Sequence, residues 1–170
     1  MSTYAPPEKT STMADAARST TRTKRYRAKK TFDDIDRQDF RNEVFATLRD
    51  YFKASIDELN SIEGFKGRFA DMKDGAFTCS VVNVAHDRGT AHITVHPGGD
   101  RHLGDIYWSN SANAAANTSN GQFSIEQDDY EMHLVDHDYG RGGDDDKLTP
   151  RQAAERLWER FIDEAGISHD

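Results

Sequence analysis

Residues 76–99, AFTCSVVNVAHDRGTAHITVHPGG, determine how the middle of this chain folds. They contain two runs rich in β-branched and apolar residues, 76–85 and 90–96, which are typical of β-strands. The residues between the runs, 86–89, end in glycine and are typical of a hairpin loop. This stretch therefore predicts an antiparallel β-hairpin.

Short strand-like segments continue on both sides of the hairpin. Asp74-Gly75 is a turn signal, which makes 66–72 a preceding strand. After the hairpin, the segments LGDIYWS, GQFSIEQ and YEMHLVD each have the length and composition of a strand. Five or six consecutive strands with short turns predict an antiparallel meander.

A long helix is predicted before the meander, from Asp36 to Ile62, with Gly64 ending it. At about 1.5 Å per residue this helix would span roughly 40 Å. Its apolar residues recur every three or four positions, as on one face of a helix. They are Phe40, Val44, Leu48, Tyr51, Phe52, Ile56 and Leu59.

A second helix is predicted after the meander, and its boundaries are the clearest in the chain. Thr149 and Gln152 have the spacing of a capping box, and Pro150 occupies the first helical position. Gly166 stops the helix, and Ile167 can fold back against its last turn. The apolar stripe consists of Ala153, Ala154, Leu157, Trp158, Phe161, Ile162 and Ala165.

Together these elements predict an α+β domain over 33–170, in which both helices pack on one face of the sheet. We expect its core to contain Phe40, Val44, Leu48, Phe52, Leu59, Leu157, Trp158, Phe161 and Ile162.

Charge divides the chain into a tail and this domain. Residues 1–32 hold eight Lys or Arg and two acids, whereas 33–170 hold fourteen basic and twenty-eight acidic residues. The first segment has few large aliphatic residues, so we predict a disordered basic arm. The chain lacks an apolar run of the roughly 20 residues that cross a bilayer and a secretory signal at its start. We therefore expect a cytoplasmic protein without membrane contact.

The longest uncharged polar segment is 109–121, SNSANAAANTSNG. Loops of more than about 12 residues are usually functional or disordered. Because amide side chains both donate and accept hydrogen bonds, this loop is the predicted contact for a protein or small-molecule partner. The predicted binding residues are Trp108, Asn110, Asn113, Asn117 and Asn120. The glycine-rich acidic segment 137–146 is a second candidate loop.

The basic arm is a candidate for nucleic-acid binding. Clustered cations neutralise phosphates, and an aromatic ring can stack on a base. The residues concerned are Arg18, Arg22, Lys24, Arg25, Tyr26, Arg27, Lys29 and Lys30. The same cluster is also typical of a solubilising tail, and charge alone does not decide between the two.

The spacing of the His, Asp and Cys residues gives little support for a catalytic or metal site. His92 and His96 would lie roughly 13 Å apart along a strand, too far to bind one zinc. Segment 136–146 does not have the spacing of a calcium-binding EF-hand loop. Cys79 lies in a predicted core strand, where free cysteine is usually inert. We therefore predict no metal site and no cofactor.

Three functions remain open. The leading hypothesis is a non-catalytic binding or regulatory module that engages a protein or small ligand through loops 109–121 and 137–146. The first alternative is a nucleic-acid-associated protein that binds through residues 18–30. The second is a small hydrolase-like enzyme in which His133, His137 and Asp138 serve as acid or base. An exposed edge strand would also permit a homodimer.

Overall fold

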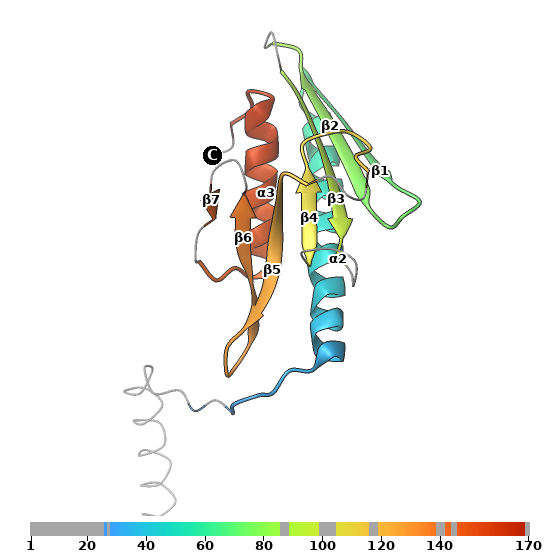
Figure 1. Ribbon diagram of the computed structural model, residues 1–170. Helices are drawn as coiled ribbons and strands as arrows, with labels where there is room; N and C mark the ends of the chain where they lie inside the picture. The colour runs from blue at the N-terminus through green and yellow to red at the C-terminus, as the bar shows by residue number, and fades with distance from the viewer. Residues whose placement is uncertain are drawn as a thin grey trace, which may run out of the picture. The chain divides into compact units, whose positions relative to one another are not determined.

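An antiparallel sheet runs through the middle of the chain, and its strands lie side by side in sequence order (Figure 1). The computed structural model describes residues 26, 28–85, 89–98, 105–115, 119–138, 142–143 and 146–168. The chain divides into residues 1–30 and 31–170, and the elements described below belong to the second unit. The predicted disordered arm lies outside the described residues, except at residue 26 and at 28–32.

Six strands of four or more residues confirm the predicted meander. They are β1 (Phe65–Asp71), β2 (Phe77–Asn83), β3 (Thr90–Pro97), β4 (Ile106–Ser109), β5 (Gly121–Gln127) and β6 (Met132–Asp138). A seventh strand, β7 (Gly142–Gly143), pairs with β6 and was not predicted. Its two glycines carry no side-chain alternation, which is the signal that identifies a strand in a sequence.

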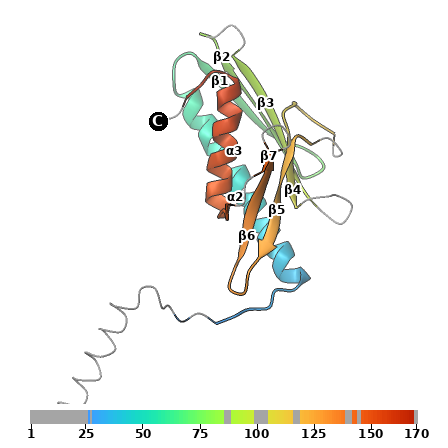
Figure 2. The same cartoon turned by 60° about the vertical axis from the view of Figure 1, so that its left-hand side comes forward.

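Alternate residues of each strand face the two helices. In the β2–β3 hairpin, Phe77 lies opposite Val95 and Cys79 opposite Ile93, and all four side chains are buried. Both helices lie on this side of the sheet (Figure 2). The fold is therefore the predicted α+β arrangement, with the two helices covering one face.

Helix α2 (Asp34–Asn60) begins two residues before the predicted start because two aspartates cap it reciprocally. The Asp33 carboxylate accepts a hydrogen bond from the Asp36 amide at 2.8 Å, and the Asp36 carboxylate accepts one from the Asp33 amide at 3.1 Å. The helix ends before the predicted Ile62. Its buried residues are Val44, Leu48, Phe52, Ile56 and Leu59, whereas Phe40 is only half-buried against the core.

Helix α3 (Pro150–Glu164) has the predicted boundaries. The Thr149 hydroxyl accepts from the Gln152 amide, and the Gln152 side chain accepts from the Thr149 amide. Gly166 has a φ of 71°, and the amide of the buried Ile167 returns to the Ile162 carbonyl. Within the described part of the chain, neither helix is long and apolar enough to span a membrane.

The core centres on aromatic rings from the sheet and from both helices. Phe52 of α2 is fully buried, and its ring centroid lies 5.6 Å from that of Phe77 on β2. The same ring lies 5.2 Å from Trp158 and 5.9 Å from Phe161, both on α3. The predicted burial of Trp158 is confirmed, since only 4 % of it is exposed.

Gly121 occupies a place on β5 where the sheet accepts no side chain. A Cβ atom there would overlap with the Cζ2 atom of Trp108 and would lie 2.8 Å from the His137 carbonyl oxygen. We expect Gly121→Ala to lower the free energy of unfolding by about 2–3 kcal/mol, because backbone atoms would have to separate. Urea denaturation followed by circular dichroism measures this change.

Gly67→Ala is the matched control. Its Cβ would lie 3.0 Å from Ile56 Cδ1, the flexible end of a side chain, so the expected cost is below about 1 kcal/mol. Equal losses in the two variants would show that the contact with the Trp108 ring and the β6 backbone does not limit position 121.

Cys79, the single cysteine of the chain, is buried as a free thiol on β2. Burial raises the pKa of this thiol to about 12, so it stays protonated at neutral pH. Because the thiolate is the reactive form, a thiol-specific aromatic disulfide should modify the native protein at least ~100-fold more slowly than the denatured chain. A Ser111→Cys variant, exposed in the native state, is the control for reagent activity. Comparable native rates for Cys79 and this control would contradict the assignment.

Candidate functional site

Both predicted loops begin at the same end of the sheet (Figure 1). Trp108 on β4 lies opposite Gly121 on β5, and Gly121 lies opposite Asp138 on β6. Segment 109–121 therefore leaves and re-enters the sheet beside the point where segment 137–146 leaves it. The described ends of both segments therefore lie at the same end of the sheet.

The first half of the polar loop folds back over the sheet face that points away from the helices. The Thr94 hydroxyl donates to the Ser111 carbonyl at 2.6 Å and accepts from the Ala114 amide at 3.1 Å. The Thr78 hydroxyl accepts from the amide of Asn113, whose φ of 51° is one that asparagine tolerates better than most residues. This part of the loop is therefore packed structure.

The predicted asparagines have different positions. The Asn120 Oδ1 atom accepts hydrogen bonds from the Asn110 amide at 2.8 Å and from the Ser109 hydroxyl at 3.3 Å, so Asn120 closes the loop. The residues Asn110 and Asn113 are exposed. Asn117 lies outside the described residues.

A pocket of about 250 Å³ lies between this end of the sheet and α3. It brings together two of the predicted residues, Trp108 and Asn110, with Asp138 at the start of the second loop. An apolar floor with a few convergent polar groups is typical of ligand sites, and this volume suits a small group. The lining residues are Ile93, Trp108, Asn110, Asp138, Leu157, Arg160, Phe161 and Glu164.

Sequence reasoning did not find Arg160 and Glu164. Charged residues on a helix normally indicate a solvated face, and both lie on α3 beside its apolar stripe. The available signal was the spacing of Arg156 and Arg160, which places two guanidinium groups on adjacent turns. That spacing does not reveal what the arginines contact.

Arg160 fixes the polar side of the pocket. Its guanidinium group donates to both carboxylate oxygens of Asp136 and forms an ion pair with Asp138 at 3.4 Å. It also lies 5.9 Å from the centroid of the Trp108 ring. Asp136 is only 1 % exposed, and Arg156 approaches its carboxylate to 3.7 Å. A carboxylate this buried needs charge partners, so Asp136 holds Arg160 in position beside the pocket.

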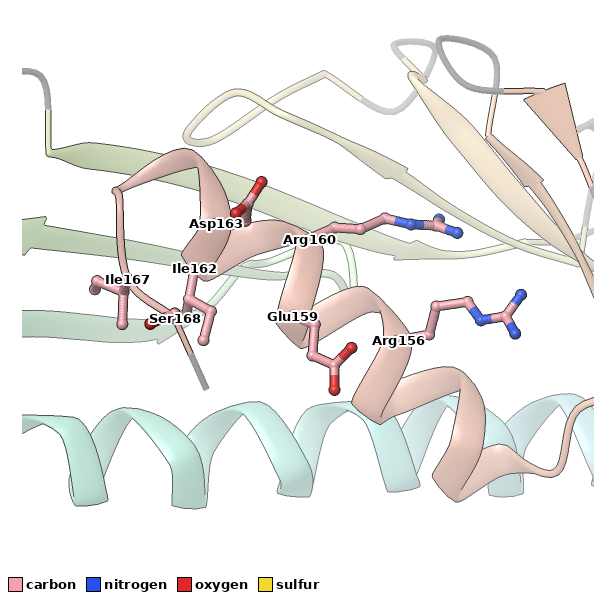
Figure 3. Close-up of a pocket in the computed structure, with 7 residues that line it drawn as sticks. All are labelled: Arg156, Glu159, Arg160, Ile162, Asp163, Ile167 and Ser168. Atoms are coloured by element: carbon pink, nitrogen blue, oxygen red, sulfur yellow. The ribbon is translucent and has the colours of Figure 1, made fainter. Parts of the chain in front are cut away.

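The outer side of α3 has a second hollow, of about 450 Å³, which shares Arg160 with the pocket. The Arg156 and Arg160 side chains extend in the same direction, whereas Glu159 points toward α2 (Figure 3). Both guanidinium groups pair with β6 carboxylates, which balance their charge. The pocket between α3 and the sheet is therefore the stronger candidate.

The three acid–base candidates are not brought together. His137 contacts the Ser124 hydroxyl through Nε2 at 2.9 Å, on the face away from the helices. Asp138 pairs with Arg160 on the opposite face. His133 lies four residues from His137 on the same strand, about 13 Å away along the backbone. The described residues also contain no group of three His, Cys, Asp or Glu side chains placed to hold a metal ion.

The predicted nucleic-acid-binding residues lie mostly outside the described residues. Among those described, Tyr26 is 98 % exposed, and Lys29 and Lys30 are exposed as well. The undescribed residues are Arg18, Arg22, Lys24, Arg25 and Arg27. Binding through the arm stays a prediction.

Comparisons with known proteins identify relatives from one bacterium, Sinorhizobium fredii (strain NBRC 101917 / NGR234). Its uncharacterized protein y4kM is 39% identical over 105 residues, which cover 60% of this chain and 89% of y4kM. Its uncharacterized protein y4lF is 29% identical over 147 residues, which cover 83% of this chain but only 44% of y4lF. No solved structure matches the chain significantly.

A family model also matches the chain over the region that contains the site. The match covers residues 66–163, from β1 through nearly all of α3, and is described as the Y4lF protein domain. It includes every residue that lines the pocket except Glu164. Because this match spans more than half of the 170 residues, the chain belongs to the Y4lF domain family.

Proposed function

We propose that this protein is a non-catalytic binding module, regulatory in role, that holds a small ligand or a side chain of a partner protein in the pocket between β4, β6 and α3. The main support is the convergence of the two candidate loops on one pocket. Asn110 comes from the first loop and Asp138 from the second, and both line the pocket beside Arg160.

The charges of the lining favour a positively charged ligand group. Asp138 and Glu164 are carboxylates, while the one cation of the lining, Arg160, pairs with both the buried Asp136 and Asp138, so the lining carries a net negative charge. The aromatic rings of Trp108 and Phe161 complete the lining. Carboxylates beside aromatic rings suit an ammonium or guanidinium group on a flat or apolar body.

A cytoplasmic location accompanies this proposal. Cys79 is a free, buried thiol, and the chain has no second cysteine with which to form an internal disulfide. This composition fits a reducing compartment.

The indole N–H signals of the two tryptophans provide the test. Trp108 lines this pocket, whereas Trp158 lines a groove on the other side of α3. In proton–nitrogen correlation spectra we expect benzylamine and phenylguanidine, at millimolar concentration, to shift the Trp108 signal and leave the Trp158 signal in place. Benzoate, which has the same ring and the opposite charge, should shift neither signal. Trp108→Phe and Trp158→Phe variants assign the two signals.

Two variants with matched controls complete this prediction. Asn110→Trp should fill the pocket and abolish the Trp108 shift, whereas Ala112→Trp, exposed on the same loop, should not. Glu164→Gln should weaken benzylamine binding by roughly 3- to 10-fold, whereas Glu126→Gln, exposed on β5, should not. The proposal fails if no cation shifts the Trp108 signal, or if benzoate shifts it equally.

A further inference from the structure

The solvent-facing sides of α2 and α3 form a long groove. Two hollows lie along it, of about 730 and 330 Å³, and they share four lining residues. These shared residues, Tyr51, Ser55, Glu58 and Trp158, make the two hollows one continuous feature, called here the α2–α3 groove. On α2 it extends from Thr47 to beyond Leu59, a distance of about 18 Å at 1.5 Å per residue.

The rim of the α2–α3 groove is acidic. Four carboxylates line it, from Asp50 and Glu58 on α2 and from Glu155 and Glu159 on α3, against the single cation Arg151. Arg151 is engaged within the groove, since it pairs with Glu155 at 3.0 Å and lies 5.0 Å from the centroid of the Tyr51 ring. Asp50 pairs with Arg49 at 3.4 Å, so the surplus of negative charge on the rim comes mainly from Glu58 and Glu159.

The rim carboxylates affect the pKa of the Tyr51 hydroxyl. Burial raises its pKa first, and the carboxylates of Glu155, Glu159 and Glu58 raise it further, against a lowering by Arg151. Carboxylates from both helices therefore face the same point in the groove. A cation in the groove would be attracted from both sides.

The floor of the α2–α3 groove is apolar. Its second hollow contains Leu59, Phe65, Trp158 and Ile162, with Ile62 at the edge. Ile62 is 48 % exposed, so it presents apolar surface at this edge of the groove. An apolar floor below a charged rim is typical of grooves that bind an amphipathic segment.

We propose that the α2–α3 groove is a docking surface for a basic, amphipathic segment of a partner protein. Lysine and arginine side chains of the segment contact the rim carboxylates, above all Glu58 and Glu159, and an apolar side chain packs against Ile62 and Trp158. The same rim repels phosphate, which excludes nucleic acids and anionic lipid surfaces from this groove. The groove lies on the other side of α3 from the proposed ligand pocket, so the two proposals stand independently.

The probe is a fluorescein-labelled amphipathic peptide about four helical turns long, with Lys and Arg on its polar face and Leu on its apolar face. We expect its fluorescence anisotropy to rise on binding, and its affinity to fall as salt is raised. In correlation spectra the peptide should shift the Trp158 indole signal and leave the Trp108 signal in place. A peptide with Glu at every Lys and Arg position should not bind.

Charge-reversal variants with a matched control test whether the acidic rim is responsible for peptide binding. Glu58→Lys combined with Glu159→Lys should weaken peptide binding at least ~10-fold. Glu43→Lys combined with Glu126→Lys changes the net charge equally at exposed positions outside the groove, and should weaken it less than ~2-fold.

A separate variant tests the contribution of the apolar floor to peptide binding. Ile62→Ser should weaken binding roughly 3- to 10-fold, because it removes exposed apolar surface from the groove. Ile35→Ser, at a position that is 69 % exposed near the start of α2, should have no effect. Absence of peptide binding, equal losses in test and control variants, or a shift of Trp108 in place of Trp158 would each overturn the proposal.

Discussion

The position of the Phe52 side chain determines how the layers of this fold meet. Its ring is fully buried and contacts Phe77 on the sheet and Trp158 and Phe161 on α3, so one side chain of α2 touches both the sheet and the other helix. Aromatic rings at these separations pack with defined geometry, which sets the position of α3 against the sheet. The pocket and the α2–α3 groove both depend on that position, because α3 forms a wall of each.

Helix α3 separates two kinds of charge by an offset of one residue. Glu155 and Glu159 line the groove beside α2, while Arg156 and Arg160 reach the carboxylate of Asp136 on β6. Successive residues of a helix are rotated by about 100°, so two pairs with four-residue spacing lie along neighbouring faces. The sequence AAERLWERF therefore places acids on one side of the helix and bases on the next, around an apolar stripe that is buried in the core.

The fold could be predicted because its signals are local. The capping box at Thr149, the apolar spacing of both helices and the turns of the meander each occupy a few consecutive residues, whereas the reciprocal cap of Asp33 and Asp36 was not predicted. Three of the eight lining residues of the candidate site could also be predicted, since loop length and composition indicated Trp108, Asn110 and the segment that contains Asp138. The rest depends on contacts between distant residues. The hydroxyls of Thr78 and Thr94 hold loop 110–115 against the sheet, and the buried Asp136 holds Arg160. Neither of these contacts corresponds to a recognisable pattern in the sequence.

The order of the strands has a consequence for biosynthesis. Because each strand pairs with the one before it, every hairpin can close as soon as its second strand has been made, and the sheet has a low contact order. Its apolar face near β3 and β6 stays uncovered, however, until α3 follows. During synthesis the chain therefore passes through a stage in which a nearly complete sheet exposes an apolar face. Exposed apolar surface favours aggregation, and the packing of α3 removes it.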